Sequence, residues 1–241
     1  LGEGSQRIEQ ALEAALPEAR ICRVDADSMR PKNRWRTVER AMREGALDIL
    51  AGTQMLAKGH DFPNLSLVGV VNVDGALLSA DFRAAERLFA LLVQVTGRAG
   101  RADRPGRALI QTAYPDHPLF SALKTHDYAG YADLLLEQRQ RAGFPPFRHQ
   151  ALIRAEAPAL EAALAFLAAF ASVIRELGLP VKVYDPVAAR MAKVAGRERA
   201  QLLLQAAKRQ PLQTALTQAR NRLSGNARKV RWAIDVDPQD F

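Results

Sequence analysis

The first half of the chain alternates between helical and extended hydrophobic patterns. Residues 5–16 carry apolar side chains at helical spacing, with Ser5 as the candidate N-cap, and residues 34–44 predict a basic helix that Gly45 stops. A third helical pattern covers 79–95. Short apolar runs with the composition of buried strands lie at 20–24, 47–51, 65–73 and 107–113. Strands that alternate with helices predict a parallel sheet covered on both faces.

The second half has a different rhythm. A helical stretch over 118–142 ends at Gly143 and the Phe-Pro-Pro-Phe segment at 144–147, where we place a domain boundary. Beyond it, the pattern predicts strands at 150–156, 181–184, 201–205 and 229–236, and helices at 159–177 and 211–223. The predicted fold class is therefore α/β. A parallel-sheet domain is followed by a smaller α+β domain of the split β-α-β-β-α-β type.

The sequence Q-V-T-G-R-A-G-R, which begins at Gln94, contains the strongest chemical signal. Gln94, Arg98 and Arg101 are spaced i, i+4 and i+7, so they share one face if the helix continues through them. Gly97 and Gly100 each cost a helix about 1 kcal/mol relative to alanine, which indicates a backbone that a ligand approaches closely. Two guanidinium groups on one face suit the oxygens of a phosphate. A solvated arginine face at a helix end is the alternative interpretation.

A polar loop follows the second predicted strand, and ligands of parallel sheets gather at the carboxyl ends of the strands. This loop runs from Gly52 to Pro63 as G-T-Q-M-L-A-K-G-H-D-F-P. Its polar side chains are Thr53, Gln54, Lys58, His60 and Asp61. The chain has four histidines and a single cysteine, Cys22, so we predict no metal site in it. We expect the acidic residues Asp74, Asp81 and Glu86 to orient nearby arginines by ion pairing.

The motif at Gln94 resembles motif VI of superfamily 2 helicases, Q-x-x-G-R-x-x-R, and the loop after Gly52 resembles their motif V. Together with N-V-D-G-A at 72–76 and S-A-D-F-R-A-A-E-R at 79–87, these sequences resemble the PriA family, the bacterial primosomal proteins N′. The resemblance implies an incomplete RecA-like second helicase lobe. It would be followed by the C-terminal domain of an ATP-dependent, 3′-to-5′ DNA helicase that remodels stalled replication forks for restart.

The same resemblance divides the chain into helicase lobe 2 at 1–117, a helical linker at 118–147 and the C-terminal domain at 148–241. It also implies roles for single residues. The catalytic arginines would be Arg98 and Arg101, and the nucleotide-binding residues would be Lys58, Asp61, Gln94 and Gly97. The DNA-binding residues would be Thr53, Gln54, Lys193, Arg197 and Arg199. The acidic tail of single-stranded DNA-binding protein would be received by Arg209 and Gln213.

The net charge of +8 is concentrated in the second part of the chain. Residues 1–143 carry 19 Lys+Arg against 18 Asp+Glu, whereas residues 144–241 carry 15 against 8. A surplus of this size makes DNA or an acidic protein segment a plausible partner there, and solubility is the alternative explanation. Part of the surplus falls in R-M-A-K-V-A-G-R-E-R at 190–199, which we predict to be a basic loop between two strands.

Several sequence features of a complete helicase are missing. The chain has no G-x-x-x-x-G-K-S/T phosphate loop and no D-E-x-H box for magnesium. ATP and Mg²⁺ are therefore expected only in the intact protein, zinc only in the family's separate cysteine module, and ATP hydrolysis not from this chain alone. We expect a fragment that lacks the first strand of its lobe and tends to self-associate through an open sheet edge.

The class alternatives are a non-catalytic PriA-like DNA- or protein-binding scaffold and another superfamily 2 translocase, such as a RecG-like enzyme. The segment at 79–87 and the domain after residue 144 argue against the translocase. Other primosome proteins are expected partners. We predict a cytoplasmic protein without membrane contact, because no apolar run reaches the 18 residues of a membrane span.

Overall fold

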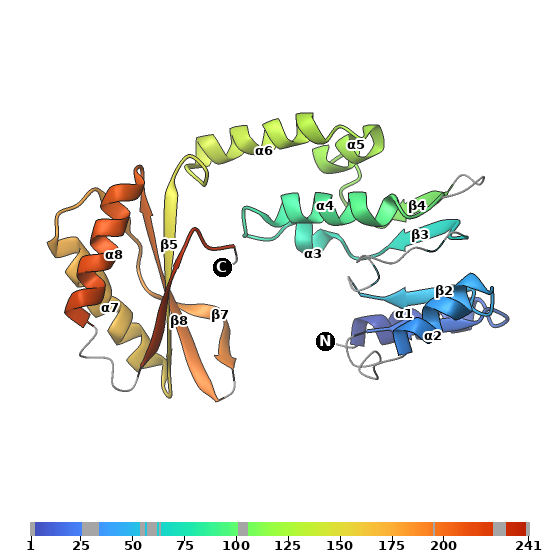
Figure 1. The fold of residues 1–241 in the computed structure, drawn as a ribbon, viewed down its shortest axis with the longest axis horizontal. Coiled ribbons are helices and arrows are strands. Elements are labelled where there is room, and N and C mark those ends of the chain that lie inside the picture. The colour runs from blue at the N-terminus through green and yellow to red at the C-terminus, as the bar shows by residue number, and fades with distance from the viewer. Residues whose placement is uncertain are drawn as a thin grey trace. The chain divides into compact units, whose positions relative to one another are not determined.

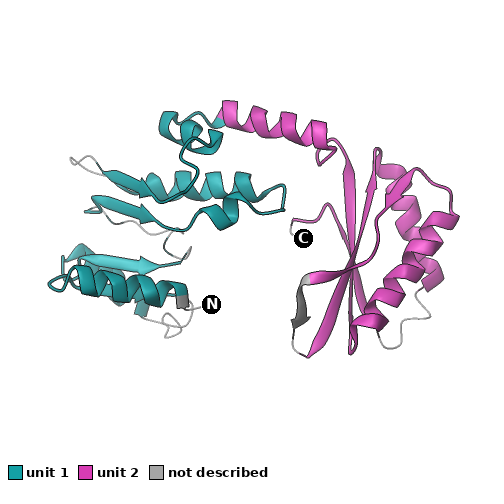
Figure 2. Ribbon diagram, turned by 180° about the vertical axis from the view of Figure 1, so that it is seen from behind, with its two compact units in different colours: residues 1–128 teal, residues 129–241 magenta. Residues whose placement is uncertain are grey.

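The computed structural model describes residues 3–25, 34–53, 56, 62, 64–100, 106–194, 196–223 and 230–239, with only the backbone of 190–194. The chain divides into two compact units, residues 1–128 and 129–241 (Figure 2). The division falls within the stretch expected to link two domains. The exact domain limits inferred from the sequence stay a prediction.

The first unit is built from parallel strands and helices (Figure 1). Its elements are α1 (Glu3–Ala15), β1 (Ile21–Val24), α2 (Arg34–Arg43), β2 (Ile49–Gly52), β3 (Leu67–Val70), α3 (Asp74–Leu77), α4 (Ala84–Thr96), β4 (Arg107–Ile110) and α5 (Pro118–Thr125). Strand β1 pairs with β2 and β3 pairs with β4, both in parallel. The α/β class is confirmed, and the described strands form two separate two-stranded sheets.

Two expectations about helix starts were wrong. Ser5 lies inside α1 and is buried, so it does not cap the helix. The helix predicted from residue 79 begins only at Ala84, because Asp81 holds a turn before it. The carboxylate of Asp81 accepts the Arg83 N–H at 2.9 Å, and its carbonyl accepts the Ala84 N–H at 2.9 Å. An aspartate that bonds its neighbouring backbone in this way competes with helix formation.

Helices α4 and α5 of the first unit contact each other and carry a buried apolar cluster. Their buried side chains are Leu88, Phe89, Leu92, Leu119, Phe120 and Leu123. His117 caps α5 by accepting the Leu119 N–H at Nδ1, 3.2 Å away. Because each large apolar side chain contributes about 1.5–3 kcal/mol when it leaves water, this cluster fixes the position of α4 and of the motif that follows it.

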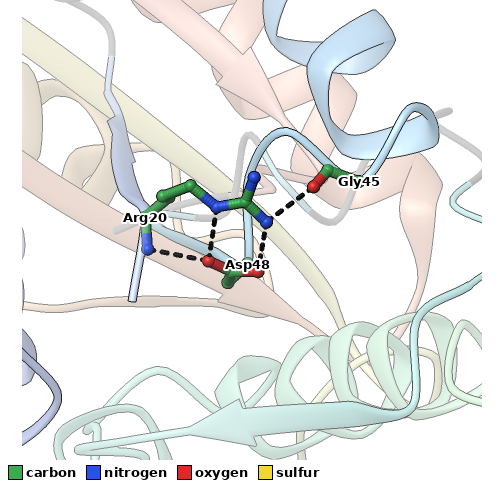
Figure 3. A network of polar contacts seen from close by, with 3 residues as sticks. All are labelled: Arg20, Gly45 and Asp48. Atoms are coloured by element: carbon green, nitrogen blue, oxygen red, sulfur yellow. Dashed lines mark hydrogen bonds and ion pairs between the residues drawn. The ribbon is translucent and has the colours of Figure 1, made fainter. Parts of the chain in front are cut away.

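A charged contact fixes the amino ends of β1 and β2 (Figure 3). The Arg20 guanidinium donates from Nε and Nη2 to the two carboxylate oxygens of Asp48, at 2.8 and 2.7 Å. Its Nη2 also donates to the Gly45 carbonyl at 2.6 Å, just past the end of α2. The Arg20 backbone N–H donates to Asp48 as well, at 2.8 Å. These hydrogen bonds hold the pKa of Asp48 well below its usual range.

The depressed pKa makes a pH-dependent contribution to stability. The contribution is present above the ordinary carboxyl pKa and is lost as the pH falls toward the folded-state pKa. We therefore expect Asp48→Asn to lower Tm at pH 7, and the difference from wild type to shrink as the pH falls below about 4. Thermal unfolding across pH 3–7 measures this, with Asp116→Asn as the control. A Tm difference that does not change with pH would refute the assignment.

The second unit is an antiparallel α+β domain. Helix α6 (Tyr128–Ala142) leads into it, and its elements are β5 (His149–Ala157), α7 (Leu160–Glu176), β6 (Val181–Val183), β7 (Val187–Val194), β8 (Arg197–Ala206), α8 (Arg209–Leu223) and β9 (Arg231–Val236). The sheet order is β6-β8-β5-β9, with β7 also paired to β8. The split β-α-β-β-α-β order is therefore confirmed, with one additional strand.

Helices α7 and α8 cover one face of this sheet (Figure 1). Leu167, Phe170 and Ile174 of α7 are buried against Leu202 and Leu204 of β8. The rings of Phe166, Phe170 and Trp232 gather at the same core, with centroids 5.6–6.4 Å apart. The opposite face carries the alternate side chains of the same strands, and it holds most of the charged residues of β5 and β8.

The predicted basic loop at 190–199 is instead most of a β-hairpin. Strand β7 runs to Val194 and β8 begins at Arg197, with Val194 paired to Arg197 and Lys193 to Glu198. Strand β7 was not predicted from the sequence, because the basic residues and alanines of β7 lack the apolar alternation of a strand. Pairing with β8, whose alternate residues Ala200 and Leu202 enter the core, supplies the stabilisation that the local sequence does not.

Candidate nucleotide and nucleic-acid interface

The carboxyl edge of the β1–β2 sheet is shaped by Gly52. A Cβ atom at this position would lie 2.2 Å from the Val24 carbonyl oxygen and 3.0 Å from the Leu56 side chain. Glycine thus lets the end of β2 lie directly against the end of β1. Thr53 follows, exposed at this edge, and its carbonyl accepts the Leu56 N–H at 3.0 Å. Thr53 therefore lies where ligands of parallel sheets are bound.

The close approach at Gly52 predicts a measurable cost for any side chain there. Gly52→Ala must displace backbone, so we expect a loss of about 1–3 kcal/mol in the free energy of unfolding, as for an overpacked core. Urea denaturation measures it. Gly69→Ala is the matched control, since a Cβ on this glycine of β3 would meet nothing within 4 Å. Equal effects of the two substitutions would show that the contact with Val24 does not constrain the edge.

The other residues predicted in this loop cannot be placed. Gln54, Lys58, His60 and Asp61 lie outside the described residues, and so does Arg101 of the arginine motif. The roles of Gln54, Lys58, Asp61 and Arg101 in binding DNA phosphate, nucleotide or the γ-phosphate stay predictions, and His60 has no assigned role.

The arginine motif lies on a turn and not on a continuing helix. Helix α4 ends at Thr96, and Gly97 is its C-cap. The Arg98 N–H donates to the Val95 carbonyl at 3.2 Å, a bond between residues three apart. The condition under which Gln94 and Arg98 would share one helical face, a helix that continues through the motif, is therefore not met. The Thr96 hydroxyl contributes to this helix end by donating to the Leu92 carbonyl at 2.8 Å.

The turn places its functional side chains in different surroundings. Gln94 and Gly97 are exposed, whereas Arg98 is half-buried with its Nε fully covered. The Gly100 N–H donates to the Leu65 carbonyl at 3.2 Å, which connects the motif to the chain just before β3. Arg98 is therefore held on a turn that is fixed at both ends, by α4 on one side and by the approach to β3 on the other.

Sequence reasoning missed Gly106, which also shapes this turn. A Cβ at Gly106 would lie 2.1 Å from the Gly100 nitrogen and 2.2 Å from the Ala99 carbonyl carbon. The residue just before β4 thus packs directly on the motif backbone. The signal in the sequence was the Pro-Gly pair at 105–106, which marks a turn but does not reveal what the glycine contacts.

The acidic residues near the motif have separate roles. Asp81 forms an ion pair with Arg87, as expected. The Asp74 carboxylate instead accepts hydrogen bonds from the Thr112 hydroxyl at 2.5 Å and from the Ala113 N–H at 2.9 Å. These hydrogen bonds lower the pKa of Asp74. Asp74 therefore connects the start of α3 to the residues just after β4, and none of its contacts among the described residues is with an arginine. Burial raises the pKa of the Cys22 thiol, which makes Cys22 a poor nucleophile.

Two predicted DNA-binding arginines lie together on the face of the second sheet opposite α7 and α8. Arg199 Nε is 2.9 Å from Glu156 Oε1, and Arg197 Nη2 donates to the Glu156 carbonyl at 3.0 Å. A neighbouring pair joins Arg154 to Asp235 at 3.2 Å. Both predicted arginines thus contact the same residue of β5. The side chain of Lys193 lies outside what the structure describes.

The predicted tail-binding residues lie on the first turns of α8. Arg209 and Gln213 are exposed and four residues apart, so they share one face of the helix. Arg209 Nη2 lies 3.9 Å from Asp237 Oδ2, a long and half-exposed contact. This pair leaves the guanidinium open to a competing carboxylate.

Neither a metal centre nor a membrane span is evident in the described part of the chain. Among the described residues, no group of three His, Cys, Asp or Glu side chains could hold a metal ion. Within the same residues, no helix is both long and apolar enough to cross a bilayer.

Comparison with known proteins identifies both units. The Helicase conserved C-terminal domain matches residues 3–103, and the Primosomal protein N C-terminal domain matches residues 140–239. The first unit therefore contains a RecA-like lobe that matches the helicase C-terminal domain. The chain belongs to the PriA family of replication restart proteins.

The relatives are similar over most or all of this chain. It is 42% identical over 241 residues to the replication restart protein PriA of Haemophilus influenzae, covering 100% of this chain and 33% of that protein. It is 39% identical over 204 residues to PriA of Bacillus subtilis, and the match covers 84% of this chain and 25% of that protein. It is 35% identical over 240 residues to PriA of Rickettsia felis, and the match covers 100% of this chain and 37% of that protein. The chain thus spans roughly a third of the length of the curated relatives it matches.

Proposed function

We propose that this chain supplies the second helicase lobe and the C-terminal domain of an ATP-dependent 3′-to-5′ DNA helicase that remodels stalled replication forks. The observation that carries the proposal is the arginine turn after α4, where Arg98 is half-buried and the backbone is fixed between Val95 and Leu65. A guanidinium held in this way suits the charge that develops on a γ-phosphate in phosphoryl transfer. Arg101 would act with it.

In the intact protein, ATP and Mg²⁺ would be bound by residues outside this chain, because the chain lacks the phosphate loop and acidic box. Lys58, Asp61, Gln94 and Gly97 would contribute the nucleotide contacts from this side. Thr53 and Gln54, at the carboxyl edge of β2, would bind a DNA phosphate. The loop after β2, which carries Thr53, Gln54, Lys58 and Asp61, would couple ATP hydrolysis to the binding of DNA. By itself, the chain is not expected to hydrolyse ATP.

The second domain would bind branched or single-stranded DNA and other primosome proteins in the cytoplasm. Its charge surplus supports this role, with Lys193, Arg197 and Arg199 as contacts on the β7–β8 hairpin and on the sheet face opposite α7 and α8. Arg209 and Gln213 would receive the acidic tail of single-stranded DNA-binding protein, with the tail carboxylate replacing Asp237. We place the functional divisions at 1–117, 118–147 and 148–241. The zinc module would lie elsewhere in the intact protein.

The test is directional unwinding by the full-length protein. Fork substrates that carry a single-stranded arm of only one polarity are incubated with ATP, and strand release is followed over time. We expect unwinding that depends on ATP and proceeds 3′ to 5′. Tight fork binding without strand release would instead support the non-catalytic scaffold.

A further inference from the structure

Helix α2 presents a row of arginines directly away from the core. Arg36, Arg40 and Arg43 are spaced i, i+4 and i+7, and all three are exposed, whereas Val38 is buried. At about 100° per residue, the three side chains fall within an arc of about 60° on the side opposite Val38. We call these three residues the arginine stripe.

Two of the three arginines of the stripe have no acidic partner among the described residues. Arg43 Nη2 lies 3.0 Å from Glu39 Oε1. Neither Arg36 nor Arg40 forms an ion pair or a side-chain hydrogen bond with any residue the structure describes. Two like charges four apart on a helix repel each other and destabilise it. Because residues 1–143 are almost neutral, with 19 Lys+Arg against 18 Asp+Glu, the stripe is a local feature and not part of a generally basic surface.

Contacts at both ends hold α2 in place. At its start, the Trp35 ring packs edge-on against Phe62, with centroids 6.4 Å apart, and Phe62 belongs to the loop after β2. Just past its end, the Gly45 carbonyl accepts the Arg20 guanidinium at 2.6 Å (Figure 3). The helix therefore presents the stripe from a fixed position, and its first turn contacts Phe62, which follows the residues assigned above to DNA phosphate binding.

We propose that the arginine stripe binds the sugar-phosphate backbone of DNA next to the contact made by the loop after β2. This inference rests on the proposed function, because it extends that DNA path along α2. The stripe spans about 10 Å at 1.5 Å per residue, and DNA presents a continuous row of phosphates over such a distance. Forked guanidinium donors match phosphate oxygens. Adjacency to a loop assigned to DNA favours nucleic acid over an acidic protein segment.

The test compares two double variants of the full-length protein. Arg36→Ala/Arg40→Ala removes the two arginines of the stripe that form no ion pair with a described residue. Arg7→Ala/Lys124→Ala removes two exposed positive charges from α1 and α5 of the same unit. Alanine is the best helix former, so the stripe variant should fold with an unchanged or higher Tm. Binding to labelled forked DNA is measured by fluorescence anisotropy at several KCl concentrations.

We expect the stripe variant to bind DNA about tenfold more weakly, with a salt dependence reduced by about 1–2 in log Kd per log [KCl]. The control should remain within about twofold of wild type. If both variants lost DNA affinity equally, the loss would reflect net charge and not the stripe, and the inference would be overturned. Unchanged DNA binding, with loss of binding to an acidic peptide, would identify a protein partner instead.

The same data separate this inference from the proposed function. Normal unwinding and binding by wild type, with an unaffected stripe variant, refutes the stripe alone. A wild-type protein that binds no DNA at any salt concentration refutes both the proposed function and the stripe.

Discussion

Replacing Arg98 by alanine in the full-length protein is expected to lower kcat for ATP hydrolysis by about 10³–10⁵-fold, the range for an arginine finger. Its guanidinium would contact charge that develops only in the transition state, so the KM for ATP should change little. Arg98→Lys should restore little activity, because an ammonium cannot replace the forked donors. Steady-state hydrolysis with saturating DNA measures these effects.

Arg107→Ala is the control for Arg98, since this exposed arginine begins β4 outside the motif. We expect it to hydrolyse ATP at nearly the wild-type rate. A kcat for Arg98→Ala within tenfold of wild type would show that the arginine turn does not serve the nucleotide. The half-buried setting of Arg98 would then have a structural role.

Phe170→Ala is expected to lower the free energy of unfolding of the second unit by about 3–5 kcal/mol. Phe170 is fully buried on α7, and its ring centroid lies 5.8 Å from that of Trp232 on β9. Removing it leaves a cavity between the helix layer and the sheet. Urea denaturation followed by Trp232 fluorescence measures this loss, with Trp35→Phe in all proteins so that one tryptophan reports.

Phe147→Ala supplies the matched control, because Phe147 is 41% exposed in the segment before β5. Its effect should stay within about 0.5 kcal/mol, as for most surface substitutions. If Phe170→Ala cost no more than Phe147→Ala, the aromatic cluster would not be the stabilising centre of this domain.

The sequence was most informative where local pattern and tertiary packing agree. The apolar stripe of α7 and the alternation in β8 have clear periods because each buries one face in a single core. The end of α2 near Gly45 was also predictable, because glycine readily adopts the left-handed conformation that ends a helix. In the structure Gly45 has this conformation, with a φ of 69°. The family resemblance rested on the exact residues of the motifs, which are more specific than the spacing of apolar residues.

The failures have a common physical cause, which is that contacts distant in sequence decided the local structure. Strand β7 exists because β8 pairs with it, although its own residues resemble a loop. The helix start at Ala84 is the exception, because there Asp81 bonds backbone groups only two and three residues ahead. The role of Gly106 depends on the approach of residues 99 and 100, which no spacing rule reveals. The same holds for Asp74, whose partners lie 38 and 39 residues away.

We propose that this chain completes a DNA-dependent ATPase. The most direct test is the rate of ATP hydrolysis by the full-length wild-type protein, measured with and without forked DNA. We predict hydrolysis that DNA stimulates, and none from the 241-residue chain alone under the same conditions. Fork binding by the full-length protein without any ATP hydrolysis would contradict the claim and leave a DNA-binding scaffold.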